Sequence, residues 1–357
     1  MDTAPPKYAK KQTLSLKGKL IHYVMTWLRL TNRPTIKLYR GFGNANKLVV
    51  FGHVLRRSAL PRKRYRDNGL VNVLAVIRLF LVKPQPHASV RIRCVGHVVE
   101  TQAEADGFFR IEIKLDEPLP PGEYPVRAEF LSQTLTPETI LGTGSGQVYI
   151  PSPTTYGCIS DIDDTFLISH SSTITKRLLV LLTENAHSRE PFEGVVAHYQ
   201  LLAEANSGPH QRNPFFYVSS SEWNLYDYIL EFSEKNGLPE GIYLLNQIKR
   251  LSQVLQTGKS KHLTKFDRIA DILEAYPDMQ FILLGDDSQQ DPTIYETVVR
   301  HYPKQIRCVY IRQINKANHS ATEELVNKIQ QAGVTCCYFE KSSTAREHSL
   351  QAGLVAS

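Results

Sequence analysis

The sequence has few cysteines, with five among 357 residues. None of them forms a CxxC pair, and an odd number leaves one thiol unpaired in any disulfide scheme. Long apolar segments are also missing: the longest, Leu70–Val82, falls short of the ~20 residues that span a bilayer. The basic N-terminus precedes no uninterrupted apolar segment with a cleavage site, as a secretory signal would require. These absences predict a reduced, cytoplasmic protein in which Leu70–Val82 forms a buried helix.

Acidic residues are almost missing from the first 66 positions, which hold 16 Lys and Arg against Asp2 alone. The whole chain has 42 basic and 35 acidic residues, so a +15 segment precedes a −8 body. Such asymmetry indicates an anionic partner, either a membrane or a nucleic acid. The remaining composition is ordinary: 42% hydrophobic residues can fill a core, and the length indicates about two domains.

Residues 1–34 form a basic N-terminal segment in which apolar side chains recur at helical spacing between Leu20 and Leu28. Flanking lysines make this a basic amphipathic helix that would lie in a membrane interface. The alternative is a helix that packs on its own domain, and the sequence leaves both open. A second basic run, Arg56–Arg66, is interpreted as a solvated loop, with lipid headgroups or nucleic acid as alternatives.

Residues 35–150 consist of short β-type runs separated by turns such as ADG and LPPGEY. They predict a β-sandwich with the Leu70–Val82 helix inserted, and none of them has catalytic spacing. The expected strands are TIKLYRGF, KLVVFGHVL, SVRIRCVGHVVE, FFRIEIKL, YPVRAEF and GQVYI.

From residue 151 to residue 357, apolar β runs alternate with helical stretches, a pattern typical of a parallel sheet covered by helices. The ligands of such sheets bind at the carboxyl ends of the strands. The expected strands are YGCIS, NPFFYVS, GIYLL, MQFILLG, IRCVYI and VTCCYF, and the expected helices are Glu222–Asn236, Leu263–Tyr276, Thr293–His301 and Thr322–Ala332, with Gly237 and Gly333 as C-caps.

The first of these strands runs into DIDDT, which places Asp161, Asp163 and Asp164 within four residues. Carboxylates this close repel one another and raise each other's pKa unless a cation neutralises them. Mg²⁺ suits such a group because it binds a few carboxylates together with water and phosphate oxygens. A solvated acidic turn would explain the adjacent pair Asp163 and Asp164, but it would not explain the polar elements that follow.

Three further polar elements follow in order: Ser219 after an apolar strand, a lysine-rich segment before a helix, and Asp286 after FILLG. This ordered set resembles the haloacid-dehalogenase-like phosphohydrolases. DIDDT, NPFFYVSSSEWNLY, KFDRIADIL and AYPDMQFILLGDDSQQDPTIY further resemble the catalytic domain of the actin-patch type of Mg²⁺-dependent phosphatidate phosphatases. The resemblance covers roughly residues 151–357. It implies a haloacid-dehalogenase-like Rossmannoid sheet with a small cap, built from residues 166–214.

The resemblance also implies the catalytic roles. Asp161 would attack phosphorus and form an aspartyl-phosphate, which splits hydrolysis into two easier steps. Asp163 would protonate the leaving alkoxide and later deprotonate the attacking water. Thr165 would hold the turn, and Ser219 would bind a phosphoryl oxygen. An ammonium group near the phosphoryl oxygens is expected as well. Lys265 aligns best with the lysine that the family has at the start of a helix, and Lys259 and Lys261 remain candidates.

The implied metal is Mg²⁺, bound by Asp286 together with Asp161 and the backbone carbonyl of Asp163. Asp287 or Asp291 would bind it through water or orient its ligands.

Further substrate contacts are expected from Ser220 and from His170, although a lone histidine in a polar loop is more often structural. Trp223 and Tyr226 would either line a pocket for an acyl chain or headgroup, or pack the helix that they begin.

The predicted function is Mg²⁺-dependent hydrolysis of a phosphomonoester on a lipid, with phosphatidate implied by the resemblance. The chain would then be a peripheral enzyme on the inner face of a membrane, and a nucleic-acid partner is not expected. Two alternatives stay open. One is the same chemistry on a soluble phosphomonoester, a phosphoprotein or a nucleic-acid end. The other is a non-catalytic membrane adaptor.

Overall fold

The computed structural model describes residues 30–31, 33–59, 81–132, 139–162, 194–208, 211–246 and 261–355. The predicted amphipathic helix near the N-terminus and nearly all of the Leu70–Val82 run lie outside these residues. Within them, no helix is both long enough and apolar enough to cross a membrane.

The first part of the chain is rich in β-structure, as predicted. Within the described residues its ten strands join into one sheet in the order β1-β4-β3-β10-β9-β6-β7, and β2, β5 and β8 also pair with β4. All six predicted β runs contain strands, although TIKLYRGF is divided between β2 and β3, and SVRIRCVGHVVE forms the hairpin of β6 and β7. The elements are β1 (Leu30–Thr31), β2 (Thr35–Leu38), β3 (Gly41–Asn44), β4 (Lys47–Ala59), β5 (Lys83–Pro84), β6 (Ser89–Cys94), β7 (His97–Gln102), β8 (Phe108–Lys114), β9 (Gly122–Leu131) and β10 (Ile140–Ile150).

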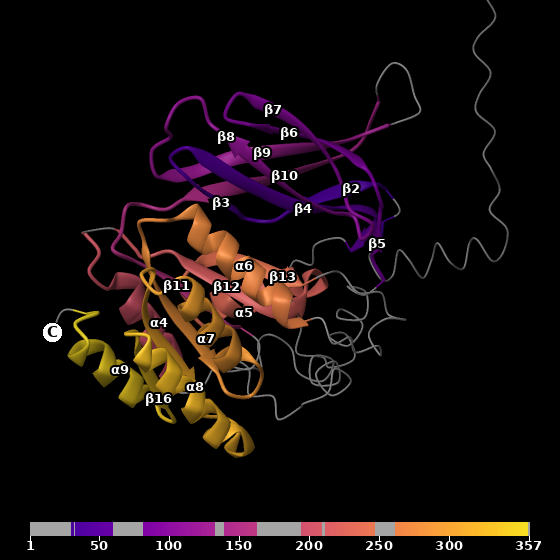
Figure 1. The fold of residues 1–357 in the computed structure, drawn as a ribbon. Helices are drawn as coiled ribbons and strands as arrows, with labels where there is room; N and C mark the ends of the chain where they lie inside the picture. The colour runs from indigo at the N-terminus through magenta and orange to yellow at the C-terminus, as the bar shows by residue number, and fades with distance from the viewer. Residues whose placement is uncertain are drawn as a thin grey trace, which may run out of the picture.

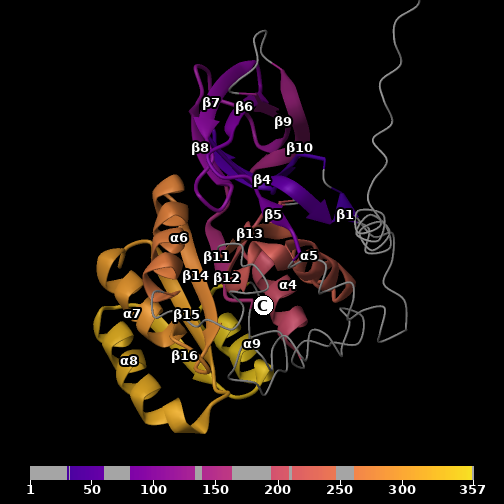
Figure 2. The same ribbon diagram turned by 90° about the vertical axis from the view of Figure 1, so that its right-hand side faces the viewer.

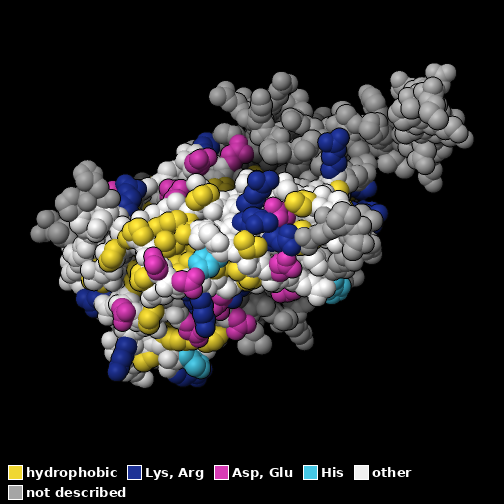
Figure 3. Space-filling model, turned by 90° about the horizontal axis from the view of Figure 1, so that it is seen from above, with side chains coloured by type: hydrophobic (Ala, Val, Ile, Leu, Met, Phe, Trp, Pro, Cys, Tyr) yellow, Lys and Arg dark blue, Asp and Glu magenta, His cyan; other side chains and the backbone are white. Residues whose placement is uncertain are grey.

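This β-rich region wraps around its own apolar core. Side chains that alternate along β4, β6 and β9 face inward, among them Leu48, Val90 and Ala128, which are fully buried. The opposite face of β4 is also buried, with Val49 and Phe51 in a second apolar cluster. The opposite faces of β6 and β9 carry charges of both signs. Arg91 pairs with Glu100 at 2.6 Å, and Figure 3 shows basic and acidic side chains interspersed over this face of the molecule. The described surface is therefore mixed in charge.

The second part is an α/β region with a six-stranded sheet in the order β13-β12-β11-β14-β15-β16 (Figure 1). Every pairing in it is parallel, which confirms the predicted sheet. The elements are β11 (Tyr156–Ser160), α4 (Val195–Glu204), β12 (Phe215–Glu222), η1 (Trp223–Leu225), α5 (Tyr226–Lys235), β13 (Gly241–Asn246), α6 (Lys261–Ala275), β14 (Gln280–Asp286), α7 (Asp291–His301), β15 (Ile306–Arg312), η3 (Lys316–Asn318), α8 (His319–Gln331), β16 (Thr335–Phe339) and α9 (Ser342–Gln351).

Local sequence explains several of these boundaries. Gly237 and Gly333 follow α5 and α8 with φ of 69° and 84°, a conformation that glycine adopts without strain, so both predicted C-caps are confirmed. Helices α4 and α9 were not predicted, because neither has a strong apolar periodicity. The strand order reverses beside β11, and at such a point the carboxyl ends of the strands leave a crevice for a ligand.

The two regions share one apolar core, whose buried side chains come from both of them. Figures 1 and 2 show the two regions next to each other. The β-rich strands lie beside β12, β13, α5 and α6. Trp223 stacks on Tyr39 with ring centroids 4.0 Å apart, and it is 5% exposed. A polar contact also links the two regions: the Tyr276 hydroxyl donates to the Gly43 carbonyl at 2.9 Å. Trp223 and the buried Tyr226 thus pack between the regions, the second of the two roles considered for them.

Candidate active site

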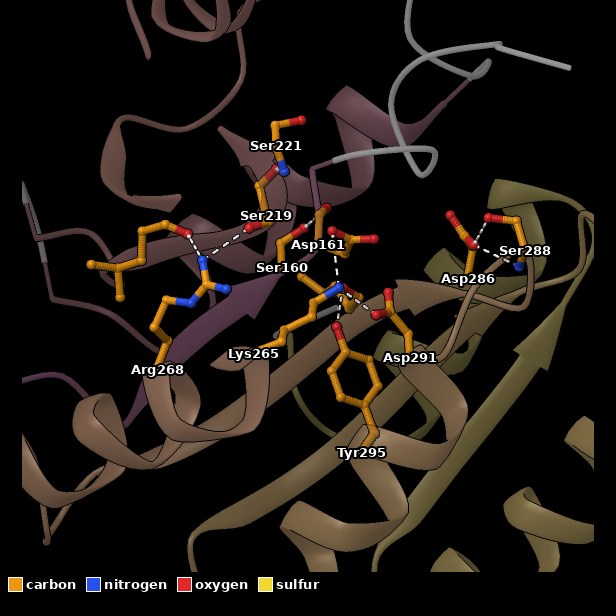
Figure 4. A network of polar contacts seen from close by, with 12 residues as sticks. Ser160, Asp161, Ser219, Ser221, Lys265, Arg268, Asp286, Ser288, Asp291 and Tyr295 are labelled. Atoms are coloured by element: carbon orange, nitrogen blue, oxygen red, sulfur yellow. Dashed lines mark hydrogen bonds and ion pairs between the residues drawn. The ribbon is translucent and has the colours of Figure 1, made fainter. Parts of the chain in front are cut away.

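The carboxyl edge of the parallel sheet holds the buried carboxylates and the buried lysine that the structure describes in the α/β region (Figure 4). Asp161 comes directly after β11, and its backbone N–H donates to the Leu284 carbonyl of β14 at 2.8 Å. Its side chain is fully buried. The sheet pairing therefore fixes the Asp161 backbone at the point where the strand order reverses.

Lys265, on α6, is the cation of this site. Its Nζ lies 3.1 Å from Asp161 Oδ1, and it also contacts Asp291 Oδ1. The lysine side chain is 4% exposed. A buried ammonium is costly unless it is paired, so two carboxylate partners account for its place here. Of the three lysine candidates, Lys265 lies beside Asp161. Lys259 and the side chain of Lys261 are outside the described residues.

Asp291 begins α7 and faces the same point. Burial raises its pKa well above the usual range, and the nearby negative charge of Asp161 raises it further. Its Oδ2 is buried and has no hydrogen-bond partner. Gly285 makes room for this oxygen, because a Cβ at that position would lie only 2.6 Å from it. The glycine of the GDD sequence is therefore a spatial requirement of the site.

Asp286 is the last residue of β14 and Asp287 follows it. Their side chains accept hydrogen bonds from different groups. Asp286 Oδ1 accepts the backbone N–H and the hydroxyl of Ser288, at 2.7 and 2.5 Å. Asp287 Oδ1 accepts the N–H groups of Ile314 and Asn315. Its Oδ2 accepts the Tyr338 hydroxyl at 2.6 Å. Both carboxylate oxygens of Asp287 thus accept hydrogen bonds, and Oδ1 anchors the loop after β15.

Ser219, the predicted phosphoryl-binding serine, lies at the end of β12 and is fully buried. Its Oγ accepts the Ser221 N–H at 2.9 Å. Ser220 is its half-buried neighbour. Asp163, Thr165 and His170 lie outside the described residues, so their predicted roles stay predictions.

The donor set suits a hard divalent cation, because Asp161, Asp286 and Asp291 offer carboxylate oxygens at one edge of the sheet. Burial of Asp291 Oδ2 without a hydrogen-bond partner fits a cation neighbour. Within the described ranges, however, no three His, Cys, Asp or Glu side chains are arranged as a complete metal-binding group. Asp163, the remaining ligand that the resemblance implies, is not among those residues.

Two residues of this site were not singled out in the sequence. The Tyr295 hydroxyl donates to the Leu284 carbonyl at 2.8 Å, behind the lysine and its carboxylates. Arg268 donates to the Ser219 carbonyl at 3.0 Å. Lys265 and Arg268 are three residues apart on α6 and so share a helix face, but this spacing alone does not single out the arginine in the sequence.

Residues 156–313 match the family model of the phosphatidate phosphatase APP1 catalytic domain. Phosphatidate phosphatase APP1 of Saccharomyces cerevisiae is 27% identical over 225 residues, which make up 62% of this chain and 34% of that protein. An uncharacterized protein of Schizosaccharomyces pombe is 22% identical over 186 residues, 52% of this chain and 29% of that one. The chain thus spans about a third of the length of the curated relatives that it matches.

Among solved structures, a carbohydrate acetylesterase from Xanthomonas citri covers 90% of this chain and 67% of its own, at 12% identity and a TM-score of 0.23. That score is too low to indicate a shared fold. The sequence matches, in contrast, confirm the predicted resemblance: over residues 156–313 the chain is similar to the phosphatidate phosphatase APP1 catalytic domain.

Proposed function

We propose that this chain is a Mg²⁺-dependent phosphomonoester hydrolase with a haloacid-dehalogenase-like sheet, acting on phosphatidate or a related lipid phosphate through an aspartyl-phosphate. The observation that carries the proposal is the buried group of Asp161, Lys265 and Asp291 at the carboxyl edge of the sheet. Its support is the catalytic-domain family match over the same part of the chain. The strand order agrees with that of a doubly wound sheet.

In the first step, an Asp161 carboxylate oxygen attacks phosphorus while the bond from phosphorus to the ester oxygen breaks. The leaving alkoxide takes its proton from Asp163, which afterwards removes a proton from the attacking water. Water then cleaves the aspartyl-phosphate, so inorganic phosphate leaves and Asp161 is restored. Lys265 holds Asp161 in place and offsets the negative charge on the phosphoryl oxygens.

Mg²⁺ would be held by Asp161, Asp286 and the backbone carbonyl of Asp163, and when bound it would neutralise charge on the transferring phosphoryl group. Asp291 would orient Lys265 and the ligands around it.

Phosphate release from phosphatidate in mixed micelles tests this proposal, compared with release from soluble phosphomonoesters and with and without Mg²⁺. We expect Mg²⁺-dependent release that is fastest with phosphatidate. Faster release from soluble esters would favour a soluble substrate, a phosphoprotein or a nucleic-acid end. No release from any phosphomonoester would favour the non-catalytic adaptor.

We further propose that the basic N-terminal segment brings the enzyme to an anionic membrane surface on the cytoplasmic side. The support is its excess of Lys and Arg, since the described β-rich surface is mixed in charge. Each Lys or Arg near such a surface contributes about 1 kcal/mol. Deletion of residues 1–29 is therefore expected to weaken binding to anionic liposomes at low salt. Binding that is unchanged, or indifferent to salt, would contradict this role.

A further inference from the structure

We propose that Arg268 is a positioning residue that shapes the serine-bearing end of β12 for binding a phosphoryl group, an inference that rests on the proposed phosphomonoester hydrolysis. Arg268 and Lys265 are three residues apart on α6, so their side chains leave the same face of the helix. Lys265 reaches Asp161 and Asp291. Arg268 reaches the two neighbouring strand ends instead (Figure 4).

Strand β12 breaks its pairing with β13 where its serines lie. Val218 pairs with Leu244, and the next pair in register is Glu222 with Asn246. Three residues, Ser219–Ser221, therefore stand opposite one residue of β13 and form a bulge. Bulges disrupt the hydrogen-bond ladder and re-aim side chains, and they are frequent beside active sites.

Arg268 supplies hydrogen bonds at this break. Its Nη1 donates to the Ser219 carbonyl at 3.0 Å and to the Leu244 carbonyl at 3.2 Å, one from each strand. Hydrogen bonds from a charged donor are stronger than those between neutral groups. The guanidinium thus links β12 to β13 where the backbone hydrogen bonds between these strands are interrupted. It also fixes the position of the Ser219 carbonyl.

The fixed carbonyl determines where the Ser219 hydroxyl lies. Ser160 of β11 pairs with Tyr217 of β12, so Asp161 and Ser219 leave adjacent strands at nearly the same level. Ser219 Oγ accepts the Ser221 N–H at 2.9 Å. Because both the backbone and the hydroxyl oxygen of Ser219 are held, the serine side chain is already positioned before a phosphoryl group arrives.

The test compares the full-length chain with R268Q, which removes the charged donor, and R268K, which keeps the charge without the guanidinium fork. R110Q is the matched control, because Arg110 contacts Asp271 on the same helix α6 at 3.3 Å but does not touch β12. Two quantities are measured. One is the affinity for inorganic phosphate in the presence of Mg²⁺, by calorimetry. The other is the rate of hydrogen exchange at the amides of residues 219–222.

We expect R268Q to bind phosphate about 10- to 100-fold more weakly and R268K to show a smaller loss. Exchange at residues 219–222 should be faster in R268Q and unchanged in R110Q. Wild-type phosphate affinity in R268Q would overturn the proposal, and so would a loss of stability that leaves phosphate affinity unchanged. If R268Q does not fold, R268K decides, since wild-type affinity and exchange in that variant would overturn it equally.

The proposed function and the role of Arg268 are contradicted by different results. A wild-type chain that binds no phosphate and hydrolyses no phosphomonoester would contradict the proposed function. A wild-type chain that binds phosphate, combined with an R268Q variant of unchanged affinity, would contradict only the role of Arg268.

Discussion

The β-rich region and the α/β region both bury apolar strands, but they bury different charged groups. Of the Asp, Glu, Lys, Arg and His side chains that the structure describes in the β-rich region, only those of His53 and Glu129 are buried. The α/β region buries carboxylates and cations together at one edge of its sheet. They are Asp161, Lys265, Asp286, Asp287, Asp291 and Arg312. Burying a charged group destabilises the fold unless the group is paired. The gathering of buried charged side chains at this edge therefore marks it as the candidate active site, at a cost in stability.

The β-rich region serves that edge through packing. Trp223 lies between the two regions, only two residues after the serine bulge of β12, and its ring contacts Tyr39 and Phe51. A displaced Trp223 would move the segment that carries Ser219. The comparison therefore predicts that changes in the α/β edge abolish activity at little cost in stability, whereas changes in the shared core reduce stability first.

The largest expected effect is on activity, from Asp161→Asn. The amide is nearly isosteric with the carboxylate but is a poor nucleophile, so phosphate release should fall on the order of 10⁴-fold or more. Phosphate release and circular dichroism would be measured on the same samples. Asp278→Asn, at an exposed position on the same region, is the control and should retain full activity. Substantial turnover by the Asp161 variant would exclude this residue as the nucleophile.

Next in size is the loss of stability from Trp223→Ala. Removal of a buried tryptophan from a packed core typically costs about 3–5 kcal/mol of unfolding free energy. Because the core is shared, both regions should lose stability together, in one denaturant transition seen by probes in either region. Val98→Ala, at a side chain that is 53% exposed, should change stability by less than about 0.5 kcal/mol. Separate transitions for the two regions would contradict a single cooperative core.

The elements of this comparison differ in how well the sequence predicts them. The parallel strands are predicted because runs such as YGCIS do not alternate between apolar and polar residues and would be buried on both faces. All five residues of this run, which forms β11, are indeed buried. Asp161, Ser219 and Lys265 follow from motif order. Arg268 does not, because its role depends on a register break between β12 and β13 that no local pattern reveals. The shared core was missed for a similar reason: nothing near Tyr39 in the sequence shows that Trp223, far along the chain, will stack on it.

A smaller effect concerns pH. Burial, together with a smaller effect of the nearby Lys37, lowers the pKa of His53 from 6.5 to about 3. Between these values the unfolded chain binds a proton that the folded chain does not, so unfolding free energy falls as the pH drops from about 6.5 toward 3. At pH 5 this amounts to about 2 kcal/mol.

His53→Gln tests that contribution. The variant should show a shallower dependence of unfolding free energy on pH between 4.5 and 6, by about 1.4 kcal/mol per pH unit. His198, in the α/β region, also has a pKa of about 3 through burial and provides the comparison, because its own slope remains in the His53 variant. An unchanged slope would mean that His53 is protonated in the folded protein.

The smallest effect is expected from one of the ion pairs that cross between the regions. Lys37 Nζ lies 2.6 Å from Asp227 Oδ2, but the two side chains are 29% and 63% exposed. Exposed pairs contribute about 0.2–1 kcal/mol, and salt screens them. A double-mutant cycle with Lys37→Gln and Asp227→Asn isolates the pair from the effect of Asp227 on the start of α5. Coupling below about 1 kcal/mol would leave the aromatic core as the main attachment between the regions. Coupling of several kcal/mol would show instead that surface charges hold them together.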